Sequence, residues 1–309
     1  MKSKTIKSIL RKKLQHWLKH VDDENVRKII EDNAICTGGS IASMLLGEKV
    51  SDYDFYFKTK ESATAVAEYY VKKFIANPPP RFKGRPLPIR VMSENGRVKI
   101  MIKSAGIVSE AGEEEYQYFE TLQGQEDAEE YVESATKALE DKDEEGSEKE
   151  KYRVIFMSTN AITLSNRIQV VIRFYGQVDE IHENYDFVHC TCSWDAKTGY
   201  LTLPKPALES MLAKDLQYKG GSKYPLCSII RTRKFLKREW NCNAGQYVKM
   251  AWDLNSFDLS DVEVLEDQMV GVDAAYFREV LELLKERQGK GVKTVDGTYL
   301  MQVIDKVFN

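Results

Sequence analysis

Two features of the sequence combine residue types that could do chemistry on a phosphorylated substrate. One is the turn Gly38-Gly39-Ser40, and the other is the acidic pair Asp52 and Asp54, which starts twelve residues after Ser40. On a strand, side chains two residues apart project from the same face, so the two carboxylates are predicted to stand together. They repel each other unless a cation neutralises them, and Mg²⁺ prefers carboxylate and phosphate oxygens. The pair therefore predicts a divalent metal site.

The glycine turn supplies what two carboxylates cannot. Glycine lets a backbone approach a phosphate closely, and a helix that starts at the turn offers free N–H groups and the positive end of its dipole. Ser40 adds a hydroxyl donor. Alone, a D-x-D sequence is usually a solvated strand end, and a Gly-Gly-Ser sequence is usually only a turn. The order turn, helix, acidic strand is more specific, and it predicts a site for a metal-bound triphosphate.

The elements that position these residues follow from periodicity and turn signals. After the turn, the sequence predicts a helix that Gly47 ends, and then a strand over residues 50–57 with Tyr53 and Phe55 on the face opposite the acids. Further strands are expected over residues 89–102 (a hairpin), 152–157, 168–174, 187–194 and 200–203. Helices are expected over residues 5–20, 22–32, 61–75, 207–216, 224–240, 244–253, 273–287 and 294–307. This order predicts an α+β fold, with a mixed-sheet domain over residues 1–204 and an all-helical domain over residues 205–309.

The run from Gly38 to Gly47, followed by Ser51-Asp52-Tyr53-Asp54, resembles the head-domain motif of tRNA nucleotidyltransferases and bacterial poly(A) polymerases. Those enzymes belong to the polymerase-β-like nucleotidyltransferase superfamily. The resemblance implies that Asp52 and Asp54 bind Mg²⁺ or Mn²⁺, and that the glycine turn with Ser40 holds the triphosphate of an NTP. The family's Arg-Asp pair inside the helix is replaced here by Ala42-Ser43, so the resemblance is closer to the superfamily than to these enzymes.

A third carboxylate is usual across that superfamily, on a neighbouring strand. Asp186, between Tyr185 and Phe187, is the candidate, with Asp179 and Glu180 as weaker ones. Asp186 would then be catalytic and a metal ligand beside Asp52 and Asp54. The alternative is that Asp186 only caps a strand or accepts a backbone hydrogen bond.

A second resemblance lies in the segment from Tyr224 to Phe235, which is similar to a helix of the same family. Arg231 and Lys234 are one turn apart, and Arg238 follows on the same face, so the stripe is predicted to bind the triphosphate or an acceptor backbone. A solvated basic face explains these residues equally well. The family's base-reading E-D-x-x-R element is absent from this segment, so neither CCA addition nor a base preference is implied.

The bulk composition sets the remaining expectations. The chain has 309 residues, is 42% hydrophobic and carries a formal net charge of −3, which by itself does not indicate nucleic-acid binding. Residues 1–20 and 72–90 are locally basic and could contact tRNA or other RNA, whereas an acidic insertion at about 109–151 could bind a protein partner. The five cysteines suggest no disulfide framework, and no apolar run approaches a membrane span, so we expect a cytoplasmic, soluble protein.

These features predict a metal-dependent nucleotidyltransferase, which moves a nucleoside monophosphate from an NTP to a hydroxyl acceptor. Two cations about 3.5–4 Å apart could activate the acceptor hydroxyl and stabilise the departing pyrophosphate. RNA is the favoured acceptor, and a protein side chain or a small molecule are alternatives. Two other classes stay open: a degenerate nucleotidyltransferase fold that only binds or regulates, and a structural RNA-binding module.

Overall fold

The computed structural model describes residues 1–78, 89–94, 96–102, 152–157, 160–261, 264–265, 268 and 296–308. The chain divides into two compact units. The first contains the described residues up to His182 together with Cys190–Pro204, and the second contains Glu183–His189 and the described residues from Lys205 onward. The predicted acidic insertion, most of the basic segment 72–90 and the predicted helix over residues 273–287 lie outside the described residues.

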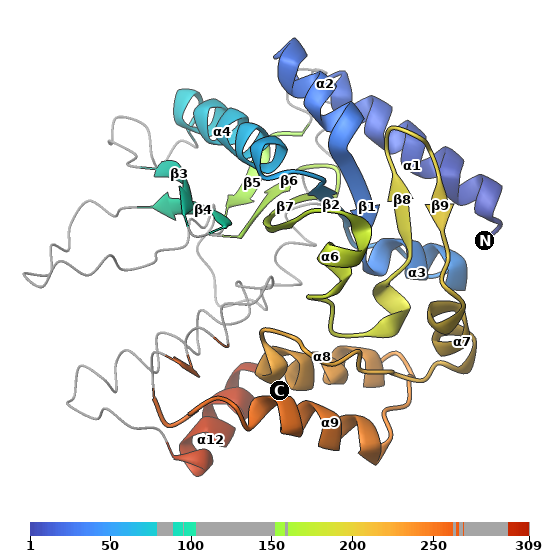
Figure 1. Cartoon of the computed structure of the whole chain (residues 1–309), viewed down its shortest axis with the longest axis vertical. Coiled ribbons are helices and arrows are strands. Elements are labelled where there is room, and N and C mark those ends of the chain that lie inside the picture. The colour runs from blue at the N-terminus through green and yellow to red at the C-terminus, as the bar shows by residue number, and fades with distance from the viewer. Residues whose placement is uncertain are drawn as a thin grey trace, which may run out of the picture. The chain divides into compact units, whose positions relative to one another are not determined.

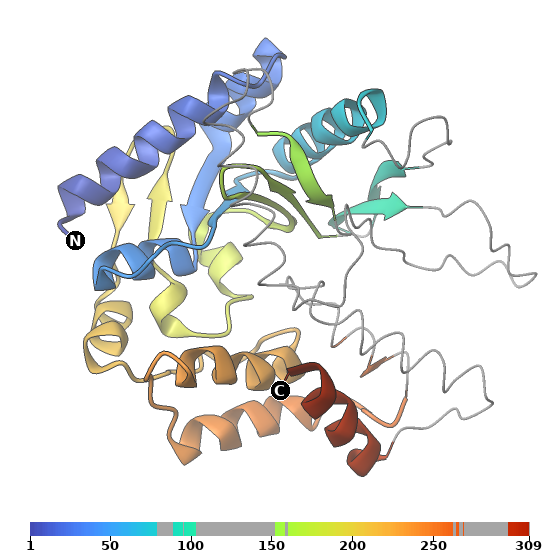
Figure 2. The same cartoon turned by 180° about the vertical axis from the view of Figure 1, so that it is seen from behind.

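A seven-stranded mixed sheet forms the centre of the first unit (Figures 1 and 2). Its strands lie in the order β5 (Val154–Met157), β6 (Ala161–Leu164), β7 (Ile168–Tyr175), β2 (Tyr53–Phe57), β1 (Ala34–Thr37), β8 (Ser193–Asp195) and β9 (Leu201–Thr202). Only β2 and β7 pair in parallel, and every other neighbouring pair is antiparallel. The hairpin β3 (Ile89–Glu94) and β4 (Arg97–Ile102) forms a second, two-stranded sheet. The α+β class with a mixed sheet is confirmed.

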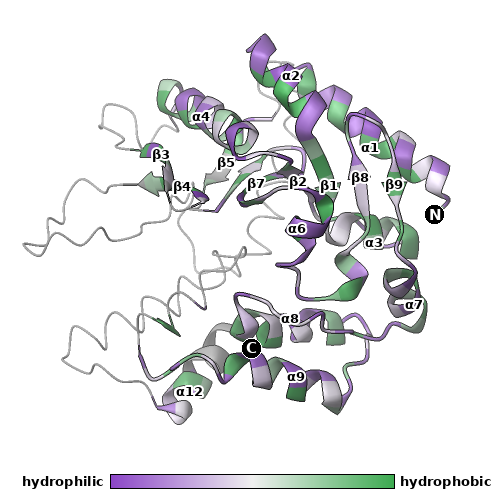
Figure 3. Cartoon of the chain, viewed as in Figure 1, coloured by the Kyte–Doolittle hydropathy of each residue, from purple (hydrophilic) through white to green (hydrophobic). Residues whose placement is uncertain are grey.

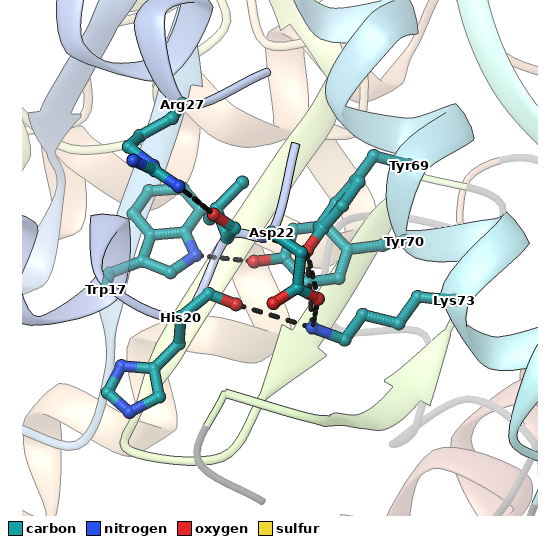
Figure 4. Close-up of polar contacts among 8 residues, drawn as sticks. Trp17, His20, Asp22, Arg27, Tyr69, Tyr70 and Lys73 are labelled. Atoms are coloured by element: carbon teal, nitrogen blue, oxygen red, sulfur yellow. Dashed lines mark hydrogen bonds and ion pairs between the residues drawn. The ribbon is translucent and has the colours of Figure 1, made fainter. Parts of the chain in front are cut away.

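Three helices of the first unit lie together beside the sheet: α1 (Ser3–Leu18), α2 (Glu24–Asn33) and α4 (Lys60–Ala76). Trp17 of α1 packs against Phe55 of β2, with ring centroids 5.1 Å apart. The Trp17 indole N–H donates to the hydroxyl of Tyr70 on α4 at 2.5 Å (Figure 4), and both side chains are buried. The apolar residues of these helices therefore form a common core with the strands. Figure 3 shows that each helix carries hydrophobic as well as hydrophilic residues.

The connection from α1 to α2 is also tied to α4. Lys73 of α4 donates to the Asp22 carboxylate at 2.9 Å and to the His20 carbonyl at 3.3 Å (Figure 4). Tyr69 accepts from the Asp22 backbone N–H at 3.0 Å. These contacts hold the residues before α2 in place against α4. They thereby help to position α2 and the strand β1 that directly follows it.

Local signals in the sequence explain where the helices begin and end. The Asp23 carboxylate caps α2 by accepting from the N–H groups of Asn25 and Val26 at 2.8 and 3.2 Å. Thr59 caps α4 in the same way through Ser62. The helix α3 (Gly39–Leu46) ends at Gly47, whose φ of 78° is left-handed, as predicted.

The second unit is helical where it is described, with α7 (Lys205–Ala213), α8 (Pro225–Leu236), α9 (Ala244–Leu254) and α12 (Gly297–Phe308). The predicted strand over residues 187–194 is wrong. Val188–Cys190 form a short 3₁₀ helix, and the strand β8 begins only at Ser193. The reason is that Phe187 and His189 pack into the aromatic side chains of Phe235 and Trp240, which removes them from the sheet. No helix among the described residues combines the length and apolarity that a membrane crossing needs.

Candidate functional site

The glycine turn and the acidic pair meet at one end of two neighbouring strands. In the antiparallel pairing of β1 with β2, Thr37 stands opposite Asp54. Thr37 is the last residue of β1, so the turn at Gly38 begins directly beyond the position of Asp54, and α3 starts there. Asp52 lies two residues before Asp54, immediately outside β2. Residues separated in the sequence are thus adjacent at one sheet edge.

The alternation along β2 separates the acids from the apolar core. Tyr53 faces α1, where the Lys13 ammonium lies 5.0 Å from the centre of its ring, and Phe55 faces Trp17 of the same helix. Asp54, between them, therefore projects from the other face. Its side chain and that of Asp52 are half-buried. A cation could reach both without entering the hydrophobic core.

The electrostatics of Cys36 place both acids near the start of α3. This thiol is fully buried, and burial raises its pKa far above the usual range. The negative charges of Asp54 and then Asp52 raise the pKa of Cys36 further, while a contact with Ser40 lowers it. Both carboxylates therefore act over a short range on a residue that lies two positions before the glycine turn.

Gly38 has a conformation that requires glycine. Its φ of 96° and ψ of −156° lie in a region that side chains with a Cβ rarely adopt, and its N–H donates to the carbonyl of Cys190 at 3.2 Å. Gly39 opens α3, and a Cβ added there would meet nothing within 4 Å. No side chain among the described residues caps this helix. The N-terminus of α3 therefore presents backbone donors to open space.

Ser40 contributes differently from the prediction. Its side chain is 2% exposed, and its hydroxyl lies 3.8 Å from the Cys36 sulfur. The hydroxyl thus faces the interior rather than the space in front of the turn. What Ser40 can offer to a ligand is its backbone N–H, in the first turn of α3.

A row of polar residues that the sequence alone did not indicate crosses β2, β7 and β6 at Asp54. Gln169 of β7 is the direct partner of Asp54, and Thr163 of β6 is the direct partner of Gln169. Direct partners share a face, with Cβ atoms about 4.5–5.5 Å apart. Gln169 and Thr163 are half-buried, and neither side chain has a hydrogen-bond partner among the described residues. A ligand held at Asp54 would therefore also reach the Gln169 amide.

On the other side of Asp54, the row continues with Thr37 of β1, whose side chain is hydrogen-bonded in the interior. The Thr37 hydroxyl donates to the Cys192 carbonyl at 2.8 Å and lies 2.8 Å from Nε2 of His182, the last residue of α6 (Val178–His182). Because the hydroxyl proton is used on Cys192, the His182 Nε2–H is the donor to Thr37. Thr37 and His182 are both buried. These bonds position the end of β1, from which the glycine turn leaves.

The donor set at the sheet edge fits a magnesium–triphosphate complex. Mg²⁺ is commonly held by one or two carboxylates together with substrate phosphates and water. Asp52 and Asp54 would provide the carboxylates, and the N-terminus of α3 would provide donors for the phosphates. No group of three or more His, Cys, Asp or Glu side chains within the described residues is arranged to hold a metal ion.

Asp186, Arg231 and Lys234 belong to the second unit. One carboxylate oxygen of Asp186 accepts from the hydroxyls of Ser222 and Ser228 at 2.9 and 2.7 Å, and the other is paired with the Arg231 guanidinium. Asp186 therefore has protein partners for both oxygens, and Arg231 has an anionic partner. Lys234 lies one turn further along α8 and is half-exposed. Their roles as a metal ligand and as nucleotide contacts stay predictions.

Comparisons with known proteins give one family. A sequence model described as "Gabija anti-defense 2 family protein" matches residues 8–214. A curated protein named "Gabija anti-defense 2", from Bacillus phage SPbetaL7, is 21% identical over 131 residues, which are 42% of this chain and 33% of that protein. The alignment thus spans a third of the relative's length.

Solved structures of CCA-adding enzymes are also similar. The Thermotoga maritima enzyme, complexed with tRNA, is 11% identical and has a TM-score of 0.38, and the match covers 91% of this chain and 53% of the enzyme. For the Bacillus stearothermophilus enzyme in complex with CTP, the values are 10%, 0.38, 84% and 49%. This chain therefore spans about half the length of these enzymes.

Proposed function

The chain belongs to the Gabija anti-defense 2 family, and we propose that it works as a metal-dependent nucleotidyltransferase. In this proposal it moves a nucleoside monophosphate from an NTP to a hydroxyl acceptor in the cytoplasm. The family's name describes an action against the Gabija defence. We therefore expect the acceptor to be RNA, or a protein or small-molecule component of that defence.

One observation supports the proposal above the others. The register of β1 and β2 brings the start of α3 to the residue opposite Asp54. A triphosphate at the N-terminus of α3 would thus lie beside two carboxylates, and a divalent cation would bind oxygens of both. When bound, the cation supplies positive charge and polarises the phosphate oxygens.

The chain's own residues then have separate tasks. Asp52 and Asp54 hold the cation, and the N–H groups of Gly39 and Ser40 bind the phosphate oxygens. Gln169 contacts the nucleotide next to Asp54, since it is the direct partner of Asp54 on β7. Rate enhancement comes from placing the acceptor hydroxyl in line with the α-phosphorus and from stabilising the charge that develops there.

Label transfer tests the proposal. The protein is incubated with each α-labelled NTP, with Mg²⁺ or Mn²⁺, and with mixed tRNA or a lysate of cells that contain the Gabija defence. We expect one acceptor to become labelled by the wild type and not by Asp54→Asn. Asp32→Asn is the matched control. Within the described residues the Asp32 carboxylate contacts only Lys197, in a surface ion pair at 3.1 Å, so label transfer by this variant should be unchanged. Transfer by Asp54→Asn at the wild-type rate would refute the proposed site.

A second function is supported by the contacts of Asp186. Both carboxylate oxygens of Asp186 have protein partners, which are Arg231 and two serines. In this alternative, the cation would therefore be bound by Asp52 and Asp54 without a third carboxylate. The second candidate is therefore a nucleotide-binding regulatory module that carries out no transfer. Metal-dependent NTP binding that is lost in Asp54→Asn, together with no pyrophosphate release in any lysate, would favour this function.

A further inference from the structure

The solvent-exposed face of α1 carries only polar side chains that can donate hydrogen bonds. Ile6, Leu10, Leu14 and Trp17 are buried, so the orientation of this helix is fixed. The basic face of α1 consists of its exposed residues, which are Ser3, Lys4, Thr5, Lys7, Ser8, Arg11, Lys12 and Gln15. Every one of these side chains can donate a hydrogen bond, and none is acidic.

The charges on this face are not compensated within the protein. No ion pair among the described residues involves Lys4, Lys7 or Lys12. Arg11 lies close to the backbone of Gly199 and, within the described residues, forms no ion pair either. The positive potential of the helix therefore reaches the solvent.

The placement of the lysines is also unfavourable for the helix itself. The first turn of α1 contains Lys4 and no acidic residue, and Lys2 at the N-cap gives no side-chain cap. Positive charge at a helix N-terminus opposes the helix dipole and destabilises the helix. This arrangement does not serve the stability of α1, which suggests that the charges serve a ligand.

The spacing and the chemistry point to a phosphate backbone. Lys4, Lys7 and Arg11 stand at i, i+3 and i+7, so they form a line about 10 Å long. That length covers several successive phosphates of one strand, which follow one another every 3.4 Å or so along a duplex axis. Phosphate oxygens accept from Lys, Arg, Ser, Thr and Gln side chains, which are the residue types of this face. The core of a protein interface would instead be rich in aromatic residues and Met, and this face has neither.

We propose that the basic face of α1 binds the phosphate backbone of a nucleic acid, without regard to base sequence. The binding needs neither the cation nor the NTP, so it is independent of the proposed transfer reaction. RNA and DNA share the chemistry that this face recognises, and the experiment separates them.

The test is fluorescence anisotropy with labelled single-stranded RNA, single-stranded DNA and duplex DNA of equal length and varied sequence, between 50 and 200 mM salt. The variant is Lys4→Gln/Lys7→Gln/Lys12→Gln, since glutamine keeps helix propensity while it removes charge. A plot of the logarithm of the association constant against the logarithm of the salt concentration becomes less steep by about 0.7–0.9 for each lost phosphate contact. For the triple variant we expect this plot to be less steep by about 2–3, and binding at low salt to be about tenfold weaker or worse.

The matched control is Lys28→Gln/Lys197→Gln/Lys205→Gln, which removes the same charge. These three exposed lysines lie outside the basic segments, and Lys197 and Lys205 are paired with acids at 3.1 and 3.5 Å. The control should bind within about twofold of the wild type if the position of the charge matters rather than its total. Asp54→Asn should also bind normally, even if it abolishes label transfer.

Three results would overturn the proposal. They are an equal loss in both triple variants, binding by the wild type that is insensitive to salt, and tighter binding to polyglutamate than to any nucleic acid. Circular dichroism and melting temperatures verify that the variants are folded.

Discussion

His189 gives the structure a pH dependence that can be worked out in advance. It is 2% exposed, neither ring nitrogen has a hydrogen-bond partner among the described residues, and the rings of Phe235 and Trp240 lie 4.7 and 4.5 Å away. Burial and, to a smaller extent, the positive charge of Arg238 together lower the pKa of His189 from 6.5 to about 3. A folded protein at pH 5 therefore keeps this imidazole neutral, whereas the unfolded chain protonates it.

The sign and size of the effect follow from this difference. Between the unfolded pKa and the folded pKa the unfolded state binds one more proton, so the free energy of unfolding falls as the pH falls, by about 1.4 kcal/mol per pH unit. The loss begins near pH 6.5 and ends near pH 3. From pH 7 to pH 5, the second unit should lose about 2 kcal/mol through His189 alone.

Urea unfolding at pH 7, 6 and 5, followed by tryptophan fluorescence, measures this loss. His189→Leu should remove it and should be at least as stable as the wild type at pH 7, because two unpartnered polar atoms leave the core. Phe235→Leu is the control: it should be less stable at every pH, but should keep the wild-type slope. A wild type with no loss between pH 7 and 5, or His189→Leu with the full loss, would show that a neutral, buried His189 is not the cause of the pH dependence.

Two further substitutions test the core and the turn. Tyr70→Phe should lower the free energy of unfolding by about 1–3 kcal/mol, because it leaves the Trp17 indole N–H buried without an acceptor, whereas Tyr69→Phe, nearer the surface, should cost less than half of that in the same urea titration. Gly38→Ala should cost about 1–3 kcal/mol in thermal unfolding and should also weaken NTP binding in calorimetry, because its φ is 96°. Gly47→Ala, at the other end of α3 with a φ of 78°, should lower stability but leave NTP affinity unchanged.

The parts of the site that depend on local sequence could be predicted, and those that depend on long-range pairing could not. The alternation that separates Asp54 from Phe55 needs only the period of a strand, and Gly47 ends α3 by a purely local preference. Gln169 was missed because its place beside Asp54 comes from a parallel pairing between strands more than 100 residues apart. The strand β6, which extends the same row, is only four residues long, which is the shortest run over which alternation indicates a strand.

Two site residues differ from expectation because packing decided their orientation. The hydroxyl of Ser40 points to Cys36, since the direction of α3 relative to β1 places residues four apart in contact. Asp186 lies between Tyr185 and Phe187, a pattern that is typical of an acid on a buried strand. Its segment belongs to the second unit, where Arg231 and two serines bind the carboxylate, and its role as a metal ligand stays a prediction. Neither preference is visible in a single sequence.

The proposed function requires that Asp52 and Asp54, together with the start of α3, bind one metal–triphosphate complex. Anomalous scattering from a crystal of the protein with Mn²⁺ and a non-hydrolysable NTP would locate the metal. We expect a manganese peak within coordination distance of both carboxylates, with phosphate oxygens on the N–H groups of Gly39 and Ser40. A nucleotide bound elsewhere, or a peak that neither carboxylate contacts, would contradict the proposed function.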